Sequence, residues 1–264
     1  MKKFLITLLI SLPFVTMGQG NSFAESVLAG SDSGDTSVVA PYFSAAAGWT
    51  FPFGEMGNRY SSFMNLNADL GVKTLTNWII YLDFAFQFGS NNIKHMDDYL
   101  AAMMSDGSNP FVIGSDGTDA GVVGYNRNLS LSLGIGKIIR LPFSNINSGM
   151  EVSLQGGYLQ HQIIYQSTQT KVEQLEGDYA YGYDRQMRGP MAGMFIGYRH
   201  ISKKSYANWF AGVQYSLAFT KMTRKYQFDL MSGDNKRYTD RMLTFKVGWM
   251  FPFFKRAADK IYYF

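Results

Sequence analysis

The chain has 264 residues, a formal net charge of +4 and no cysteine, and it is rich in glycine, phenylalanine and tyrosine. The lack of cysteine excludes a disulfide scaffold, a thiolate nucleophile, a cysteine-based zinc site and a lipid anchor on an N-terminal cysteine. No run of basic residues is longer than two, which excludes a nucleic-acid-binding surface, so we expect no nucleic acid partner.

The N-terminus has the build of a secretory signal peptide. Lys2 and Lys3 precede an almost wholly apolar run, residues 4–15, and small and polar residues follow. The run is shorter than the roughly 20 residues that a membrane-spanning helix needs. We therefore predict a cleaved signal peptide over 1–20, a flexible leader over 21–41 and one domain over 42–264.

From residue 42 onward, apolar and polar residues alternate with a period of two, which is typical of strands and not of helices. In the clearest segment, Leu129, Leu131 and Leu133 share one face, whereas Ser130 and Ser132 share the other. The pattern predicts eight strands, over 42–53, 59–72, 77–89, 124–140, 149–167, 188–201, 207–226 and 240–254.

The connections between these segments alternate in length. Three are short (73–76, 141–148 and 202–206), 90–123 and 168–187 are long, and 227–239 is intermediate. The first connection, 54–58, is short although it falls on the side of the long ones. Such alternation is typical of outer-membrane barrels, with short periplasmic turns and longer extracellular loops. We predict an all-β fold, a single transmembrane antiparallel up-and-down β-barrel of about eight strands. Within the first long loop, residues 93–104 favour a short amphipathic helix.

A soluble sandwich or barrel also alternates, but its apolar face is an internal core. Here one face is rich in large aromatic residues, and the opposite face holds mainly Gly, Ser, Asn and Gln. The segments are also longer than the five or six residues of an average soluble strand. Trp78, Trp249 and Phe251 lie near segment ends, as aromatic girdles at the membrane interfaces do.

The apolar-out alternation, the signal peptide and the ending Ile261-Tyr262-Tyr263-Phe264 together resemble the small outer-membrane barrels of the OmpA/OmpX/OmpW type. The resemblance implies a porin-like integral protein of the Gram-negative cell envelope, located in the bacterial outer membrane. It implies two partners, the outer-membrane lipids and the barrel assembly machinery, which reads a terminal phenylalanine during biogenesis. It is architectural and transfers no active site.

If the aromatic face meets lipid, the alternation places the polar residues inside the barrel. An eight-stranded barrel is just wide enough for side chains to fill it, and buried charges need partners. We expect a structural hydrogen-bonded network in which Lys246 lies near Asp69 or Asp83; a proton or ion path is the alternative. The predicted network residues are Asp69, Asp83, Glu151, Gln155 and Lys246.

The long loops are the expected functional surface, because loops carry binding residues on a rigid scaffold. Tyrosines clustered with arginine are common in binding patches. The equal alternative is a rim that packs on itself or on lipid headgroups, because interfacial tyrosines are expected in any such barrel. We predict a non-enzymatic barrel with a structural role, or one that binds an envelope or secretion-machinery protein through its loops. A narrow channel or small-ligand barrel is an alternative. The predicted loop surface is Asp178, Tyr179, Tyr181, Tyr183 and Arg185.

Signals for chemistry are few. His200 and Ser202 have the His-x-Ser spacing of outer-membrane lipid A deacylases, so a lipid A hydrolase is a further alternative. The pair falls next to a periplasmic turn, whereas those enzymes work in the outer leaflet. The Asp-Gly segments 106–109 and 116–119 lack the full ligand ladder of a calcium loop and indicate turns. We predict no catalytic residue, no metal site and no cofactor.

Overall fold

The computed structural model describes residue 37 and residues 39–142, 144–202 and 208–253. The predicted signal peptide, most of the predicted leader and the last four residues of the chain lie outside the described residues. Eight strands are present: β1 (Ala40–Phe53), β2 (Phe63–Lys73), β3 (Trp78–Ser90), β4 (Val122–Ile139), β5 (Gly149–Ser167), β6 (Met187–His200), β7 (Trp209–Met222) and β8 (Arg237–Pro252).

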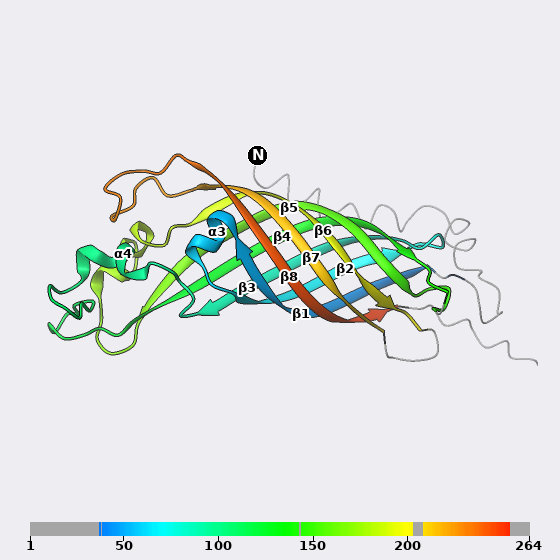
Figure 1. Cartoon of the computed structure of the whole chain (residues 1–264), viewed down its shortest axis with the longest axis horizontal. Helices are drawn as coiled ribbons and strands as arrows, with labels where there is room; N and C mark the ends of the chain where they lie inside the picture. The colour runs from blue at the N-terminus through cyan, green and yellow to red at the C-terminus, as the bar shows by residue number, and fades with distance from the viewer. Residues whose placement is uncertain (1–36, 38, 143, 203–207, 254–264) are drawn as a thin grey trace, which may run out of the picture.

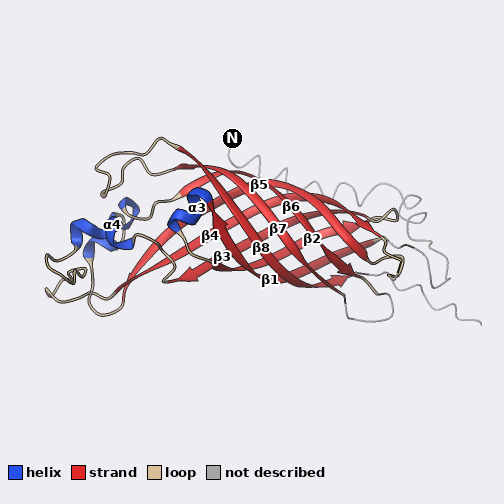
Figure 2. Cartoon of the chain, viewed as in Figure 1, coloured by secondary structure: helices blue, strands red, loops and turns tan. Residues whose placement is uncertain are grey.

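The strands form one closed antiparallel barrel in sequence order (Figures 1 and 2). Each strand pairs with the next, and β8 closes the ring against β1, with Tyr42 opposite Pro252 and Phe53 opposite Arg241. Closure leaves no unpaired sheet edge, so every strand finds backbone hydrogen-bond partners on both sides. The predicted fold class, strand number and up-and-down topology are confirmed.

The two ends of the barrel differ. The connections after β2, β4 and β6 are short, whereas those after β3, β5 and β7 are long and gather at the opposite end, on the left in Figure 1. The short helices also lie at that end (Figure 2). None of the helices in the described part of the chain has the length and apolar run needed to cross a membrane.

The alternation along each strand separates an apolar outer wall from a polar interior. Leu70, Leu133 and Val247 are 60%, 62% and 63% exposed on the outside. Their inward-facing neighbours include Asp69 and Lys246, which are buried. This is the reverse of a soluble barrel, and it is the arrangement that a hydrocarbon environment stabilises.

Two apolar clusters close the interior. Near the loop end, Met56, Tyr60 and Phe63 pack with inward-facing residues of β5 to β8. Near the turn end, Tyr42, Tyr81 and other buried side chains form a second cluster. The polar middle of the barrel therefore lies between two plugs of tightly packed apolar atoms.

The predicted start of the second strand, residue 59, is wrong. Residues Gly54–Arg59 form the helix α3, and β2 begins only at Phe63. Gly54 has a φ of +60°, which lets the chain turn inward at the end of β1. Because Met56 and Tyr60 are then buried in the barrel mouth, the apolar residues of this segment pack best as a turn of helix over the opening.

Other boundaries shift by a few residues. Ala40 and Pro41, predicted as leader, pair with β2 as part of β1. β7 ends at Met222 instead of 226 and β8 begins at Arg237 instead of 240, because Lys221 pairs with Arg237.

The predicted helix over 93–104 is shorter, comprising α4 (Met96–Leu100) and the 3₁₀ turn Ala101–Met103. Helical hydrogen bonding stops there because Met104 forms an antiparallel bridge to Val112.

Candidate functional site

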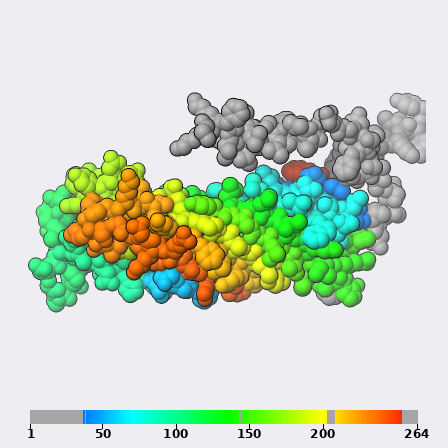
Figure 3. Space-filling model, turned by 90° about the horizontal axis from the view of Figure 1, so that it is seen from above, coloured from blue at the N-terminus to red at the C-terminus, as the bar shows by residue number. Residues whose placement is uncertain are grey.

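The three long loops pack into one cap at the end of the barrel. Leu100, Val112 and Val172, from two different loops, are buried together in an apolar cluster with Leu175 and Tyr183. Figure 3 shows the loops as a continuous mass of atoms at the left end. A shared core of this kind orders loops that would each bury too little apolar surface alone.

The loop between β5 and β6, residues 168–186, is held to the loop between β7 and β8, residues 223–236, by two ion pairs. Arg224 Nε lies 3.0 Å from each carboxylate oxygen of Asp184, and the Arg224 Nη2 also contacts this carboxylate. Arg185 pairs with Asp229. Arginine matches a carboxylate with two donors, so these contacts fix orientation as well as distance.

The five predicted loop-surface residues divide into two groups. Asp178, Tyr179 and Tyr181 lie on the exposed side of the loop, and the two tyrosines are 67% and 51% exposed. Tyr183 and Arg185 instead turn inward and hold the cap together. Sequence alone did not separate them, because the 3₁₀ helix Tyr179–Gly182 breaks the strand alternation.

The inward pair has clear packing partners. The Tyr183 ring lies 5.1 Å from the Phe228 ring, and burial, with the nearby Asp229 carboxylate, raises the pKa of the Tyr183 phenol. The Arg185 guanidinium lies 3.9 Å from the centre of the Tyr99 ring. Both residues therefore join the loop to its neighbours.

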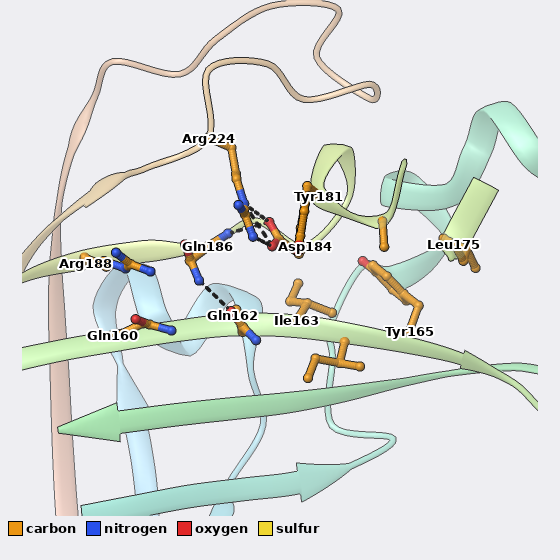
Figure 4. Close-up of a pocket in the computed structure, with 12 residues that line it drawn as sticks. Gln160, Gln162, Ile163, Tyr165, Leu175, Tyr181, Asp184, Gln186, Arg188 and Arg224 are labelled. Atoms are coloured by element: carbon orange, nitrogen blue, oxygen red, sulfur yellow. Dashed lines mark hydrogen bonds and ion pairs between the residues drawn. The ribbon is translucent and has the colours of Figure 1, made fainter. Parts of the chain in front are cut away.

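A cavity of about 560 Å³ opens between the loop 168–186 and the loop-side ends of β5 and β6 (Figure 4). Polar side chains face it from the strands, and the Gln186 amide donates to the Gln162 side chain at 2.7 Å. Tyr181 and the Asp184–Arg224 pair form its loop side. The lining residues that matter here are Gln160, Gln162, Tyr181, Asp184, Arg188 and Arg224.

A second cavity of about 370 Å³ shares Tyr181 and Arg224 with the first, and the Arg224 guanidinium lies 4.1 Å from the centre of the Tyr181 ring. Asp178, Tyr179 and Tyr226 line its outer side. The exposed tyrosines therefore frame two hollows. Sequence analysis omitted Arg224 because it placed this residue inside the predicted strand 207–226, whereas β7 ends at Met222 and Arg224 lies in the following loop.

The predicted interior residues are all buried. The Lys246 Nζ lies 4.0 Å from the Asp83 carboxylate, which also accepts a hydrogen bond from Asn67 at 2.9 Å. Asp69 accepts from Ser44 at 2.7 Å. The strand register places Asp69 directly opposite Asp83, so Lys246 has two carboxylates within this section of the barrel.

The other two predicted residues lie nearer the turn end. Arg199 Nε donates to Glu151 at 2.5 Å, and the Arg199 guanidinium lies 4.5 Å from the centre of the Phe210 ring. Gln155 accepts from the Tyr81 hydroxyl at 3.5 Å. The network is thus a set of local pairs across the barrel.

The sequence analysis did not predict a buried chain of hydrogen bonds near the loop end, formed by Tyr60, His161 and Asp240. The Tyr60 hydroxyl lies 3.1 Å from Nδ1 of His161, whose Nε2 lies 3.1 Å from the Asp240 carboxylate. Thr220 donates to the same carboxylate at 2.5 Å. The spacing of His161 from Glu151 on β5 indicates an inward direction. The side chains of His161 and Asp240 have no exposed surface, so these contacts lie within the packed mouth of the barrel.

The His200–Ser202 pair does not form a nucleophile site. The His200 ring stacks on Trp209 at 6.1 Å, and its Nδ1 lies 3.5 Å from Ser148, not Ser202. Ser202 follows the end of β6, where the strand periodicity no longer applies. In the described residues no group of three or more His, Asp or Glu side chains could hold a metal ion.

The predicted turn at residues 116–119 is present. Asp116 Oδ1 accepts from the Thr118 backbone and hydroxyl at 3.0 and 2.8 Å, which lowers the pKa of the carboxyl, and Gly117 has a φ of +81°. These contacts give the segment the geometry of a local turn.

A closed barrel with an apolar outer wall, a filled polar interior and long loops at one end defines the class. Trp78, Trp209 and Trp249 lie exposed on the outer wall near the turn end, where an interfacial girdle belongs. The protein is an integral outer-membrane β-barrel of the small eight-stranded type, located in the bacterial outer membrane.

No protein-family model and no curated protein sequence matches the chain. Solved structures do. Ail, the attachment invasion locus protein of Yersinia pestis, is 10% identical with a TM-score of 0.41, covering 82% of this chain and 99% of that one. The N-terminal β-barrel domain of Pseudomonas aeruginosa OprF is 11% identical with a TM-score of 0.34, covering 80% and 97%. A major outer membrane protein from Thermus thermophilus is 11% identical with a TM-score of 0.37, covering 80% and 100%.

Proposed function

We propose that this protein is a non-enzymatic outer-membrane barrel that binds a protein partner of the cell envelope or its exterior through the loop cap. The observation that carries the proposal is the pair Tyr179 and Tyr181, which are more than half exposed on a loop that is otherwise fixed by packing and ion pairs. Exposed tyrosines on an ordered scaffold bind with a small loss of side-chain entropy.

The chemistry around the two tyrosines fits such an interface. Arg224 lies against Tyr181, and Tyr226 faces the same hollow. Met231 and Leu230, on the neighbouring loop, are 70% and 44% exposed. Tyrosine, arginine and methionine are enriched in protein interfaces, and a hollow framed by them accepts an anchoring side chain.

The interior favours structural packing over transport or catalysis. The polar middle is enclosed by the Met56–Tyr60 cluster at one end and the Tyr42–Tyr81 cluster at the other. His200, which has the His-x-Ser spacing with Ser202, instead contacts Trp209 and Ser148.

Site-specific photo-crosslinking in living cells tests the proposal. A photoreactive phenylalanine replaces Tyr181, which is 51% exposed, and in a matched control it replaces Tyr158, which is 52% exposed on the lipid-facing wall. We expect a discrete protein adduct at position 181, its loss when Tyr179→Ala is added, and no protein adduct at position 158. A barrel with a purely structural role gives no discrete adduct at either position.

A further inference from the structure

A row of basic side chains crosses the outer wall just below the loop cap. Arg188 on β6 lies directly opposite Lys221 on β7, and Lys221 lies directly opposite Arg237 on β8. All three side chains are exposed and face away from the barrel interior. On β5 the row continues with Gln160, which pairs with Arg188.

The row has no counter-charge within its own section of wall. The four strands β5 to β8 contain two acidic residues, Glu151 and Asp240, and both are buried inside the barrel. Nearby loop carboxylates are engaged elsewhere, Asp184 with Arg224, Asp229 with Arg185, and Asp234 with the Tyr238 hydroxyl and the Lys236 backbone. Like charges directly opposite each other destabilise a strand pair, so the arrangement calls for an anion from outside the chain.

The height of the row places that anion in the membrane interface. Along β7 the outward-facing residues run from Trp209 in the turn-end girdle to Phe219, which is 54% exposed, and Lys221 follows next. This run, residues 209–219, matches the upper end of the about 9–11 tilted residues that span the hydrocarbon core. The row therefore lies where the apolar wall ends on the loop side, at the level of the outer headgroups.

The row is also one-sided. At the loop ends of β1, β2 and β3, the outward-facing residues are Phe53, Met64 and Phe88. Exposed Arg241, also on β8, lies just below the row, and exposed Arg127 on β4 lies outside this sector. A general preference for basic residues at this height would distribute them around the ring. Their concentration on β6 to β8 indicates a specific ligand on that side.

The polar cavity of Figure 4 adjoins the row. Arg188 and Gln160 line it, together with Gln162 and Gln186. Glutamine amides donate to and accept from hydroxyl groups, and the three basic side chains extend over two strand spacings, about 10 Å. An anion with hydroxyl groups and phosphates separated by several ångströms matches this surface.

We propose that the outer wall of β5 to β8 binds the headgroup of a phosphorylated glycolipid of the outer leaflet. Arg188, Lys221 and Arg237 contact its phosphates, and the glutamines of the adjoining cavity contact its sugar hydroxyls. The basic row lies on the strands and faces the membrane, whereas the loop-cap surface of Tyr179 and Tyr181 meets the adjoining cavity only at Tyr181, on its loop side.

Native mass spectrometry of the detergent-folded barrel, titrated with bisphosphorylated lipid A or with the same lipid dephosphorylated, tests the proposal. We expect wild type to retain the phosphorylated lipid preferentially. The triple variant R188Q/K221Q/R237Q should bind it roughly a hundredfold more weakly, since each basic residue near an anionic surface contributes about a factor of five. Inorganic phosphate alone should not displace the lipid.

The matched control K137Q/R140Q/K236Q removes three exposed charges that lie outside the row, and it should bind as wild type does. The single variant K221Q, with a loss of about fivefold, tests the row with minimal perturbation of the wall. Equal retention of both lipids by wild type, or undiminished binding by the triple variant, would overturn the proposal. An equal loss of lipid affinity in the control variant would show that the binding is non-specific charge attraction, and this result would also overturn the proposal.

Discussion

At the scale of single residues, two cations inside this barrel lie next to carboxylates on neighbouring or facing strands, Arg199 next to Glu151 and Lys246 next to Asp83. Arg199 and Glu151 are almost fully buried, and their contact at 2.5 Å lies beside the aromatic rings of Phe210 and Tyr42. Removing one member of a buried ion pair leaves the other charge without a partner in a poorly solvated site. The pair is therefore the most sensitive point of the interior to a single substitution.

We expect Arg199→Met to lower the free energy of unfolding by about 3–5 kcal/mol because Glu151 becomes an uncompensated buried charge. The double variant R199M/E151Q should recover part of that loss, since the charge is then absent. Urea unfolding of the barrel in lipid vesicles measures both. Lys236→Met, at an exposed loop position, serves as the control and should change stability by less than about 0.5 kcal/mol. Equal losses in the single and double variants would contradict the assignment.

At the scale of strands, the barrel depends on small residues that leave room for large ones across a strand pair. Tyr81 on β3 lies directly opposite Gly134 on β4, and its hydroxyl reaches Ser153 on β5 at 2.9 Å. A Cβ at Gly134 would lie 2.2 Å from Tyr81 Cζ. Because Gly134 has no side chain, the Tyr81 ring can cross β4 and its hydroxyl can reach β5.

Gly134→Ala should cost about 1–3 kcal/mol of unfolding free energy, because the tyrosine ring must leave its position over β4. Gly156→Ala is the matched control, since no atom lies within 4 Å of a Cβ built there. In a Tyr81→Ala background the penalty at position 134 should vanish, which a double-mutant cycle measures directly. A penalty that persists without the tyrosine ring would point to the backbone instead.

At the scale of the whole molecule, the interior is closed at both ends by apolar clusters. At the loop end, Met56 of α3 and Tyr60, the residue after this helix, are buried in the barrel mouth. At the turn end, Tyr42 and Ile79 fill the interior. Small eight-stranded barrels have little internal space beyond that of their side chains. The molecule is therefore a plugged cylinder with an ordered loop cap.

Planar bilayer recordings of the purified protein should show no steady conductance, because an ion would have to pass the two buried apolar clusters. The heat-denatured protein provides the background control for leakage caused by detergent. Reproducible ohmic steps from the folded barrel would contradict a filled interior and favour the channel alternative.

The sequence by itself determined the eight strands, their order and the direction of their side chains. Strand periodicity is local, so Asp69, Asp83, Glu151, Gln155 and Lys246 could be placed inside without a structure. The start of β2 could not be predicted in this way, because the burial of Met56 of α3 depends on the barrel mouth, which strands from the whole chain form. The division of the loop residues, with Tyr181 outside and Tyr183 inside, depends equally on neighbours from another loop.

What only the tertiary structure decided is which residues from distant segments meet. Asp184 and Arg224 lie in different loops, His161 reaches Tyr60 and Asp240 across the mouth, and Arg188, Lys221 and Arg237 come from three strands. Alternation fixes the face on which a side chain lies, but the strand register fixes its neighbours. Register here follows from the turns, the glycine contacts and the closure of β8 on β1, which are properties of the assembled ring.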